Sequence, residues 1–158
     1  MICSLSEAML ARDEARDRGA LTAVANGAFD LLHAGHVRYL RAARELVGEA
    51  GLLIVGVNSD ASVRLSKGPD RPVVPQEERA EIVDAVKGVD LVVIFEEKTA
   101  GSLLEALRPD LHVKGTDYTS GTVPERELVA GWGGRTVIAG DPKDHSTTDL
   151  IARLKSPR

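Results

Sequence analysis

Short runs of consecutive apolar residues, many of them β-branched, recur along the chain and are separated by longer mixed segments. The runs lie at Leu21–Ala25, Leu52–Val57, Leu91–Phe95, Leu111–Val113 and Thr136–Ala139. Each run is continuous rather than alternating, which is typical of strands that are buried on both faces. The pattern therefore predicts a sheet of five parallel strands, because the segments between the runs are long enough for helical crossovers.

Between these runs the apolar positions follow helical spacing. The three stripes are Val37, Leu40, Ala43 and Val47, then Ile82, Val83 and Val86, then Leu103, Leu104 and Leu107. Pro109 is expected to end the third helix, and Pro124 to lie in the first turn of another. Ser146 and Asp149 have the spacing of an N-cap with a capping box for a last helix. We therefore predict a doubly wound, Rossmann-like α/β fold with strand order 3-2-1-4-5 and helices on both faces.

Length and charge narrow the classes of protein. A chain of 158 residues suits one domain, which we place at residues 21–158, after an N-terminal helical extension at residues 1–20. The net charge of −4 argues against a nucleic-acid or membrane partner. The single cysteine, Cys3, excludes a disulfide framework and a cysteine metal site. No apolar run approaches the ~18 residues of a membrane span, and no signal peptide is evident, so we expect a cytoplasmic protein.

The segment that follows the first apolar run carries the clearest chemistry. Residues 26–36 read NGAFDLLHAGH, and a helix that begins near Gly35 would offer free N–H groups and the positive end of its dipole to an anion. His33 and His36 at that helix start can both donate hydrogen bonds to phosphate oxygens. Two other interpretations remain open: the pair could bind a metal, although no third ligand is evident, or the rings could only cap and pack.

Two motifs resemble those of a known family. The pattern GxFDxxHxGH at residues 27–36 and the later Ser146-Thr147-Thr148 turn are similar to the signatures of the cytidylyltransferase-like nucleotidyltransferases. The closest resemblance is to the bacterial D-glycero-β-D-manno-heptose 1-phosphate adenylyltransferases. These occur as a stand-alone form and as the C-terminal half of the bifunctional ADP-heptose synthesis enzyme. The shared segments are residues 57–63, 67–68, 71–73, 76–79, 89–90, 109–110, 113–118, 128–129 and 131–134.

The resemblance implies transfer of AMP from ATP to D-glycero-D-manno-heptose 1-phosphate. The products would be pyrophosphate and ADP-heptose, for lipopolysaccharide or another surface glycan. Because the acceptor phosphate is already an anion, catalysis reduces to holding two polyanions in line and neutralising their charge. The family also implies Mg²⁺ or a similar divalent ion, which we expect to be bound through the phosphates, with its protein ligands unknown. The small-molecule partners are then ATP and the sugar 1-phosphate, and a homo-oligomer is expected.

The same resemblance assigns roles to individual residues. The expected catalytic residues are His33, His36 and Lys67. Besides both histidines, the expected nucleotide-binding residues are Gly27, Ala28, Phe29, Lys114, Gly115, Asp117, Ser146, Thr147 and Thr148. The expected acceptor-binding residues are Asp30, Asn58, Asp60, Arg71 and Arg79.

Several of these assignments have plainer alternatives. Lys67 is expected in a Gly- and Pro-framed loop, where it would close over the α-phosphate, but it could be an ordinary surface lysine. Asp30 could orient its loop, approach the metal through water or cap the turn, and Asp60 could only cap the next helix. Trp132 is expected to pack rather than stack on a base, and His145 adjoins the Ser-Thr-Thr turn without being required by the motif.

Two other functions stay open. One is a cytidylyltransferase for glycerol 3-phosphate or a related acceptor, because the phosphate machinery is common to the superfamily. The segment Lys87–Asp90 lacks the Arg-Tyr-Val-Asp pattern of the glycerol branch, which leans against this alternative, whereas Thr116 replaces a glycine that is usual in the heptose enzymes. The other is a nucleotide-binding module without turnover.

Overall fold

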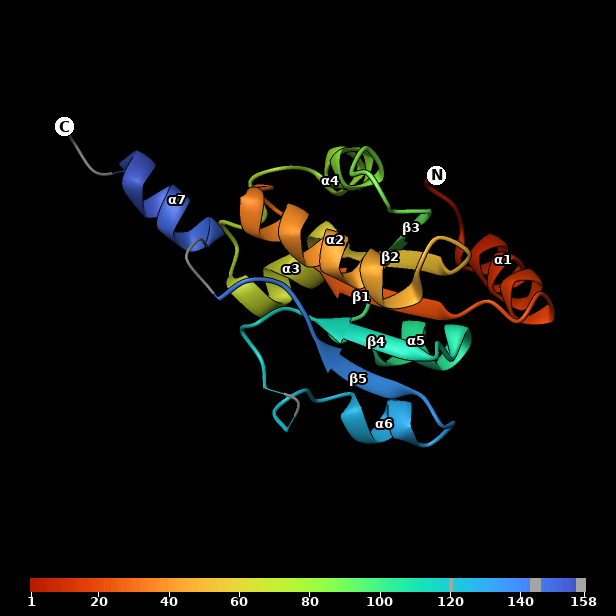
Figure 1. Cartoon of the computed structure of the whole chain (residues 1–158). Coiled ribbons are helices and arrows are strands. Elements are labelled where there is room, and N and C mark those ends of the chain that lie inside the picture. The colour runs from red at the N-terminus through yellow and green to blue at the C-terminus, as the bar shows by residue number, and fades with distance from the viewer. Residues whose placement is uncertain (120, 143–145, 156–158) are drawn as a thin grey trace.

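The predicted parallel sheet is present in the computed structural model, which describes residues 1–119, 121–142 and 146–155. The strands are β1 (Thr22–Gly27), β2 (Leu52–Asn58), β3 (Leu91–Phe95), β4 (Leu111–Lys114) and β5 (Arg135–Ile138). They run parallel in the order β3-β2-β1-β4-β5 (Figure 1). The fold class and the strand order predicted from the sequence are confirmed.

Seven helices surround this sheet within the described residues. They are α1 (Leu5–Asp17), α2 (Ala34–Val47), α3 (Asp60–Lys67), α4 (Gln76–Asp84), α5 (Gly101–Leu107), α6 (Arg126–Ala130) and α7 (Thr147–Lys155). α5 ends one residue before Arg108, as expected from Pro109, whereas Pro124 lies just before α6 rather than in its first turn. None of the helices in the described ranges has the length and apolar character needed to cross a membrane.

Alternate residues of each central strand contribute to two separate cores. Ala23 and Ala25 of β1 pack with α2 and α4, whereas Val24 packs with α1, α5 and α6 on the other side of the sheet (Figure 1). Both faces are thus covered, which explains why the strands read as unbroken apolar runs. Each buried Val, Leu or Ile side chain contributes roughly 1.5–3 kcal/mol of transfer free energy, and this burial stabilises the strands whose ends carry the site residues.

The buried face of α4 differs from the predicted stripe. Ile82 is 42% exposed, so its placement in the core is wrong, whereas Arg79, Ala80 and Val83 are fully buried. The apolar spacing does not indicate that Arg79 is buried. The face of α4 that packs on the core is therefore turned slightly from the face that the apolar residues predict.

The N-terminal segment is packed onto the α5 side of the sheet. Ser4 caps α1 and forms a capping box with Glu7, and Ala8 is buried in the core on that side. Arg12 donates a hydrogen bond of 2.7 Å to the carbonyl of Leu107 at the end of α5. Ile2 also pairs with Val92 of β3 in a single parallel bridge. The division of the chain between residues 20 and 21 stays a prediction.

Candidate active site

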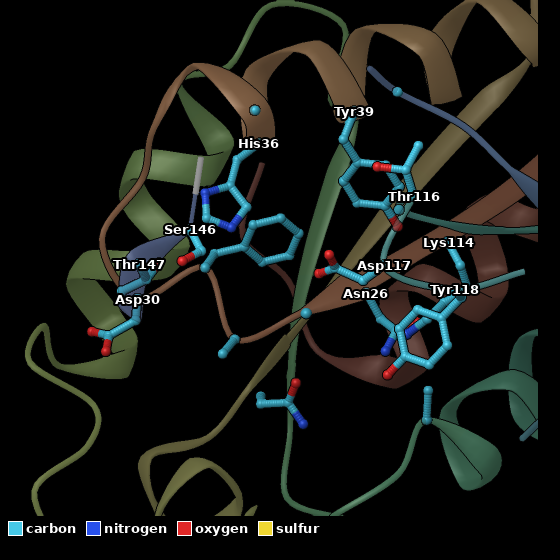
Figure 2. Close-up of a pocket in the computed structure, with 18 of the residues that line it drawn as sticks. Asn26, Asp30, His36, Tyr39, Lys114, Thr116, Asp117, Tyr118, Ser146 and Thr147 are labelled. Atoms are coloured by element: carbon cyan, nitrogen blue, oxygen red, sulfur yellow. The ribbon is translucent and has the colours of Figure 1, made fainter. Parts of the chain in front are cut away.

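A cavity of about 470 Å³ opens at the carboxyl ends of the strands, the edge at which ligands bind in doubly wound sheets. It contains most of the residues singled out from the sequence, and Figure 2 shows several of them on its walls. The predicted residues that line it are Gly27, Ala28, Phe29, Asp30, His33, His36, Asn58, Lys67, Lys114, Gly115, Asp117, Ser146, Thr147 and Thr148. Asp60, Arg71 and Arg79 are not on its wall.

The two histidines are locked against the turn between β1 and α2. His33 is the N-cap of α2, and its Nδ1 accepts a hydrogen bond from the Gly35 N–H at 3.1 Å. The Nδ1 of His36 accepts from the His33 N–H at 3.3 Å, and the two ring centroids are 3.9 Å apart. Because each Nδ1 is an acceptor, the proton of each neutral ring is on Nε2. The turn therefore orients two Nε2–H donors.

Burial, helped by neighbouring positive charge, keeps His36 neutral. Burial lowers its pKa to about 4, and the neighbouring His33 and Lys67 act in the same direction, while Asp117 opposes them. At pH 7 His36 therefore acts as a neutral donor of a hydrogen bond rather than as a cation.

Small and strained residues shape the same turn. A Cβ on Gly35 would lie 2.9 Å from the ring of His33, so a side chain there would displace the imidazole. Phe29 has a φ of 48°, in the left-handed region that costs a non-glycine residue of the order of 1–3 kcal/mol. Its ring is buried and lies 5.4 Å from that of His36, centroid to centroid. Packing of Phe29 thus holds the turn in the shape that the histidine pair requires.

Asp30 ties a distant segment to this turn. Its Oδ1 accepts hydrogen bonds from the Val73 and Val74 N–H groups at 2.8 and 2.9 Å, and its Oδ2 accepts from Arg71 Nε at 2.6 Å. Burial alone would raise the pKa of Asp30, but the bonds from Val74, Arg71 and Val73 together hold that pKa below its usual value. The loop-orienting alternative for Asp30 is the one the geometry favours, and Arg71 is directed at Asp30.

Arg79 and Asp60 form a second internal anchor. The fully buried Arg79 guanidinium donates to the carbonyls of Ala28 and Val74 and, at 2.7 Å, to Oδ1 of Asp60. The cap of α3 is Ser59 rather than Asp60, because the Ser59 Oγ accepts from the Ser62 N–H at 3.1 Å. Asp60 and Arg79 therefore hold the β1–α2 turn, the segment at Val74 and the start of α3 together. Neither residue lines the cavity, so the structure gives no support to their predicted contact with the acceptor.

Two lysines bring positive charge to the cavity. Lys67 is the last residue of α3 rather than part of the following loop, which corrects the expected placement. Lys114, at the end of β4, is 9% exposed, and its Nζ lies 4.6 Å from the centroid of the Tyr118 ring. Burial lowers the pKa of Lys114, while Glu125 and Asp117 oppose the shift.

The start of α7 completes the anion-binding side of the cavity. The Ser146 Oγ accepts from the Asp149 N–H at 3.0 Å, so the predicted N-cap is confirmed. The Thr147 hydroxyl donates at 3.3 Å to the carbonyl of Leu31 in the β1–α2 turn. The N-termini of α2 and α7 are therefore linked at one cavity, and both favour bound anions. His145 lies outside the described residues.

Several residues of the cavity wall were not among the site residues predicted from the sequence. Tyr39 donates a 2.6 Å bond to the carbonyl of Val113, and Thr116 donates at 2.7 Å to the carbonyl of Asp141. The wall also includes Arg38, Lys98, Thr99, Glu125 and Pro142. Many of them could have been predicted from their position directly after a strand, because the segments that follow parallel strands meet at the same edge of the sheet. Trp132 packs, as predicted, and donates to the carbonyl of Pro109.

The described residues contain no group of three or more His, Cys, Asp or Glu side chains placed to hold a metal ion. If His33 and His36 bound a metal, the part of the chain that the structure describes would offer no third His, Cys, Asp or Glu ligand beside them.

A buried histidine in β4 predicts that the folded protein loses stability in acid. His112 is fully buried, and burial lowers its pKa to about 3, with Lys114 acting in the same direction. Between pH 6.5 and 3 the unfolded chain binds a proton at His112 that the folded chain excludes, so stability falls as the pH falls. Between pH 7 and 5 we expect His112 to reduce the free energy of unfolding by about 2 kcal/mol.

Urea unfolding at several pH values measures this effect. A His112→Gln variant cannot titrate but keeps an amide donor for Asn26 Oδ1, which accepts from His112 Nε2 at 2.9 Å. The variant should therefore lose less stability between pH 7 and 5 than the natural chain. Parallel pH curves for the two proteins would contradict the assignment.

A doubly wound parallel sheet that presents two linked helix N-termini and paired imidazole donors at its carboxyl edge defines a nucleotide-binding α/β protein. The chain belongs to the cytidylyltransferase-like family, whose pattern matches residues 24–153.

Individual relatives are similar over most of this chain. It is 48% identical over 139 residues to a bifunctional protein HldE of Syntrophotalea carbinolica, covering 88% of this chain and 28% of that protein. The HldE of Acidiphilium cryptum is 49% identical over 141 residues, which cover 89% of this chain and 28% of the relative. The chain thus spans less than a third of the length of these curated relatives.

Solved structures share the fold. A lipopolysaccharide core biosynthesis protein of Thermoplasma volcanium superposes with a TM-score of 0.67 and 24% identity, covering 79% of this chain and all of that one. A macrolide-efflux protein of Streptococcus pneumoniae gives a TM-score of 0.62 at 20% identity, covering 85% of this chain and 52% of the other. At these identities the likeness concerns the fold alone.

Proposed function

We propose that this chain transfers AMP from ATP to D-glycero-D-manno-heptose 1-phosphate, releasing pyrophosphate and forming ADP-heptose. The observation that carries the proposal is that the N-termini of α2 and α7 meet at one cavity. His33 and His36 line this cavity, and the Nδ1 atom of each ring accepts a hydrogen bond from the backbone. The heptose assignment is supported by the sequence resemblance described above and by the high identity to proteins named bifunctional protein HldE.

The reaction in this proposal needs no general base. An oxygen of the acceptor phosphate, already ionised, attacks the α-phosphorus of ATP in line with the departing bridging oxygen. A new P–O bond forms, the bond between the α-phosphorus and the bridging oxygen breaks, and its electron pair leaves with pyrophosphate. The protein's task is then to position the two anions and to stabilise the charge that develops on them.

The site residues divide this task. The Nε2–H groups of His33 and His36 donate to oxygens around the α- and β-phosphates, where negative charge grows in the transition state. Backbone N–H groups of the β1–α2 turn and of the α7 N-terminus hold the phosphates. Lys67, at the end of α3 on the cavity wall, supplies a cation for the approaching phosphates.

A divalent ion fits this cavity only as part of the substrate complex. Asp30 already accepts three hydrogen bonds from protein groups, and the described residues form no carboxylate cluster. Mg²⁺ would therefore be held mainly by the phosphates of ATP, where it neutralises charge on the leaving pyrophosphate.

Pyrophosphate release with a panel of substrates tests the function. ATP, CTP, GTP and UTP are each combined with heptose 1-phosphate and with glycerol 3-phosphate. We expect the highest kcat/KM for ATP with heptose 1-phosphate. A clear preference for CTP with glycerol 3-phosphate would replace the proposal by the cytidylyltransferase alternative, and tight ATP binding without turnover of any acceptor would favour a non-catalytic module.

Cytoplasmic location, a homo-oligomeric state and use of the product in lipopolysaccharide or another surface glycan belong to the same proposal. Sedimentation of the purified chain distinguishes a monomer from an oligomer.

A further inference from the structure

The two central strands part from each other at their carboxyl ends. β1 stays paired with β2 as far as Gly27, and β4 stays paired with β5 as far as Lys114. Between β1 and β4, however, the last pair is Ala25 with Val113. The β1–β4 gap beyond this pair lies where the strand order reverses, which is the place where ligands enter doubly wound sheets. Residues 26–27 and 114–115, on its two sides, line the cavity.

The hydroxyl of Tyr39 bonds to both sides of this gap. Tyr39 belongs to α2, is 8% exposed and donates a hydrogen bond of 2.6 Å to the carbonyl of Val113. Burial raises the pKa of Tyr39, and a backbone hydrogen bond of Asn26 opposes that rise. A bond that lowers the pKa of a phenol is donated to its oxygen, so the Asn26 N–H is the donor. Figure 2 shows the Tyr39 side chain extending from α2 toward the ends of these strands.

This hydroxyl replaces a direct contact between the strands. Backbone N–H and carbonyl groups of neighbouring parallel strands normally bond to each other. Here the Asn26 N–H and the Val113 carbonyl both bond to Tyr39 instead. The hydroxyl is therefore a spacer that satisfies both backbone groups while it keeps the strand ends apart.

A side-chain bond spans the gap on the other face of the sheet. Leu111 and Val113 face the core under α2, so strand alternation places His112 on the α5 side. His112 Nε2 lies 2.9 Å from Asn26 Oδ1, and it donates because an amide oxygen can only accept. The gap is thus held on one face by Tyr39 and on the other by the bond between Asn26 and His112.

The proposed function places the nucleotide at this gap. Gly27, Lys114 and Gly115 are among the expected nucleotide-binding residues, and they lie on the two sides of the gap. A Cβ on Gly115 would meet no atom within 4 Å, so the backbone there borders open space. The acceptor residue Asn58, in contrast, follows β2, on the other side of β1 from β4.

We propose that Tyr39 is a positioning residue for the nucleotide. Its hydroxyl keeps the carboxyl ends of β1 and β4 apart, so that the nucleotide binds between Gly27 and Gly115 without having to separate the strands. This inference rests on the proposed function. Tyr39 acts through the two strands and does not touch the reacting atoms.

Tyr39→Phe removes only the hydroxyl and tests this role. Without the hydroxyl, the Asn26 N–H and the Val113 carbonyl are buried without a partner, so we expect the strand ends to close and bond directly. ATP must then reopen the gap. We expect the Kd for ATP, measured by calorimetry, to rise about tenfold, as for the loss of one or two ordinary hydrogen bonds. The acceptor KM and kcat should stay within about twofold.

Thr22→Val is the matched control, because it removes a hydroxyl that links the same two strands at their opposite ends. Thr22 is fully buried, and its Oγ donates at 2.8 Å to Oδ2 of Asp110, directly before β4. We expect this variant to lose stability but to keep the Kd for ATP. Sucrose favours the folded state of a weakened protein, so it is added equally to all three proteins if Tyr39→Phe needs it.

The outcomes separate this inference from the proposed function. An unchanged Kd for ATP in Tyr39→Phe, or an equal rise in Thr22→Val, overturns the inference while the function stands. An increase in the acceptor KM as large as that in the Kd for ATP also overturns it. If the natural chain prefers CTP with glycerol 3-phosphate, the proposed function fails, and the Tyr39 comparison is then decided with CTP, because the gap would serve any nucleoside triphosphate.

Discussion

Replacing His36 by alanine is expected to lower turnover about 10²–10³-fold, the usual cost of removing one preorganised donor to a transition state. The ring's Nδ1 accepts from the His33 N–H at 3.3 Å, so its Nε2–H is the group directed to the substrate. Its pKa of about 4 keeps that donor neutral at pH 7. The loss should therefore appear mainly in kcat, while the KM for ATP changes little.

Two companion variants sharpen this experiment. His36→Gln places an amide NH₂ near the position of Nε2 and should recover part of the lost rate, which a merely structural role would not predict. Arg41→Ala, an exposed change one turn further along α2, should keep full activity. Because His36 titrates only near pH 4, protonation of His36 should not contribute to the pH profile of kcat between pH 6 and 8. A His36→Ala protein with most of its activity would show that the motif has another role.

The strand positions could be predicted from the sequence because a strand that is buried on both faces is an unbroken run of apolar residues. β2 and β3 begin at Leu52 and Leu91, where their apolar runs begin, since no polar residue has to face solvent within these strands. The strand order then placed the ends of β1 and β4 side by side, which brought His33 and Lys114 to one cavity.

Partners of buried charges were not predictable in the same way. Arg71 and Arg79 look alike in a sequence, and either could bind a phosphate or a carboxylate of the protein itself. The choice depends on contacts such as that of Asp30 with Arg71, 41 positions apart, which no local pattern encodes. Glu125 was missed for the related reason that α6 is a short helix whose exact start sets the direction of that side chain.

The N-cap residue of α3 also could not be predicted from the sequence alone. Ser59 and Asp60 are adjacent, and both are favourable N-cap residues. In the structure Ser59 caps α3 and Asp60 pairs with Arg79. At the other end the helix stops after Lys67, because Gly68 adopts a positive φ of 95°. Local propensity alone leaves helix boundaries uncertain by a residue or two.

Arg79→Met is expected to lower the free energy of unfolding by about 3–5 kcal/mol, because removing one member of a buried charged network leaves its partners unpaired. The guanidinium is fully buried and serves the carbonyls of Ala28 and Val74 together with Asp60, which is 26% exposed at its side chain. Methionine fills much of the space but offers none of the donors. The β1–α2 turn, the segment at Val74 and the start of α3 then lose their common anchor.

Urea unfolding and acceptor kinetics of this variant distinguish an anchor from an acceptor ligand. Arg64→Met, an exposed change of the same kind in α3, should shift the unfolding free energy by less than about 0.5 kcal/mol. Arg79→Lys keeps the charge but not the forked geometry, so its stability should fall between those of the natural chain and Arg79→Met. If Arg79→Met instead kept its stability and raised only the acceptor KM, Arg79 would contact the substrate, as the sequence resemblance implied. Because the guanidinium is fully buried and makes its three bonds to protein groups, we expect the loss of stability.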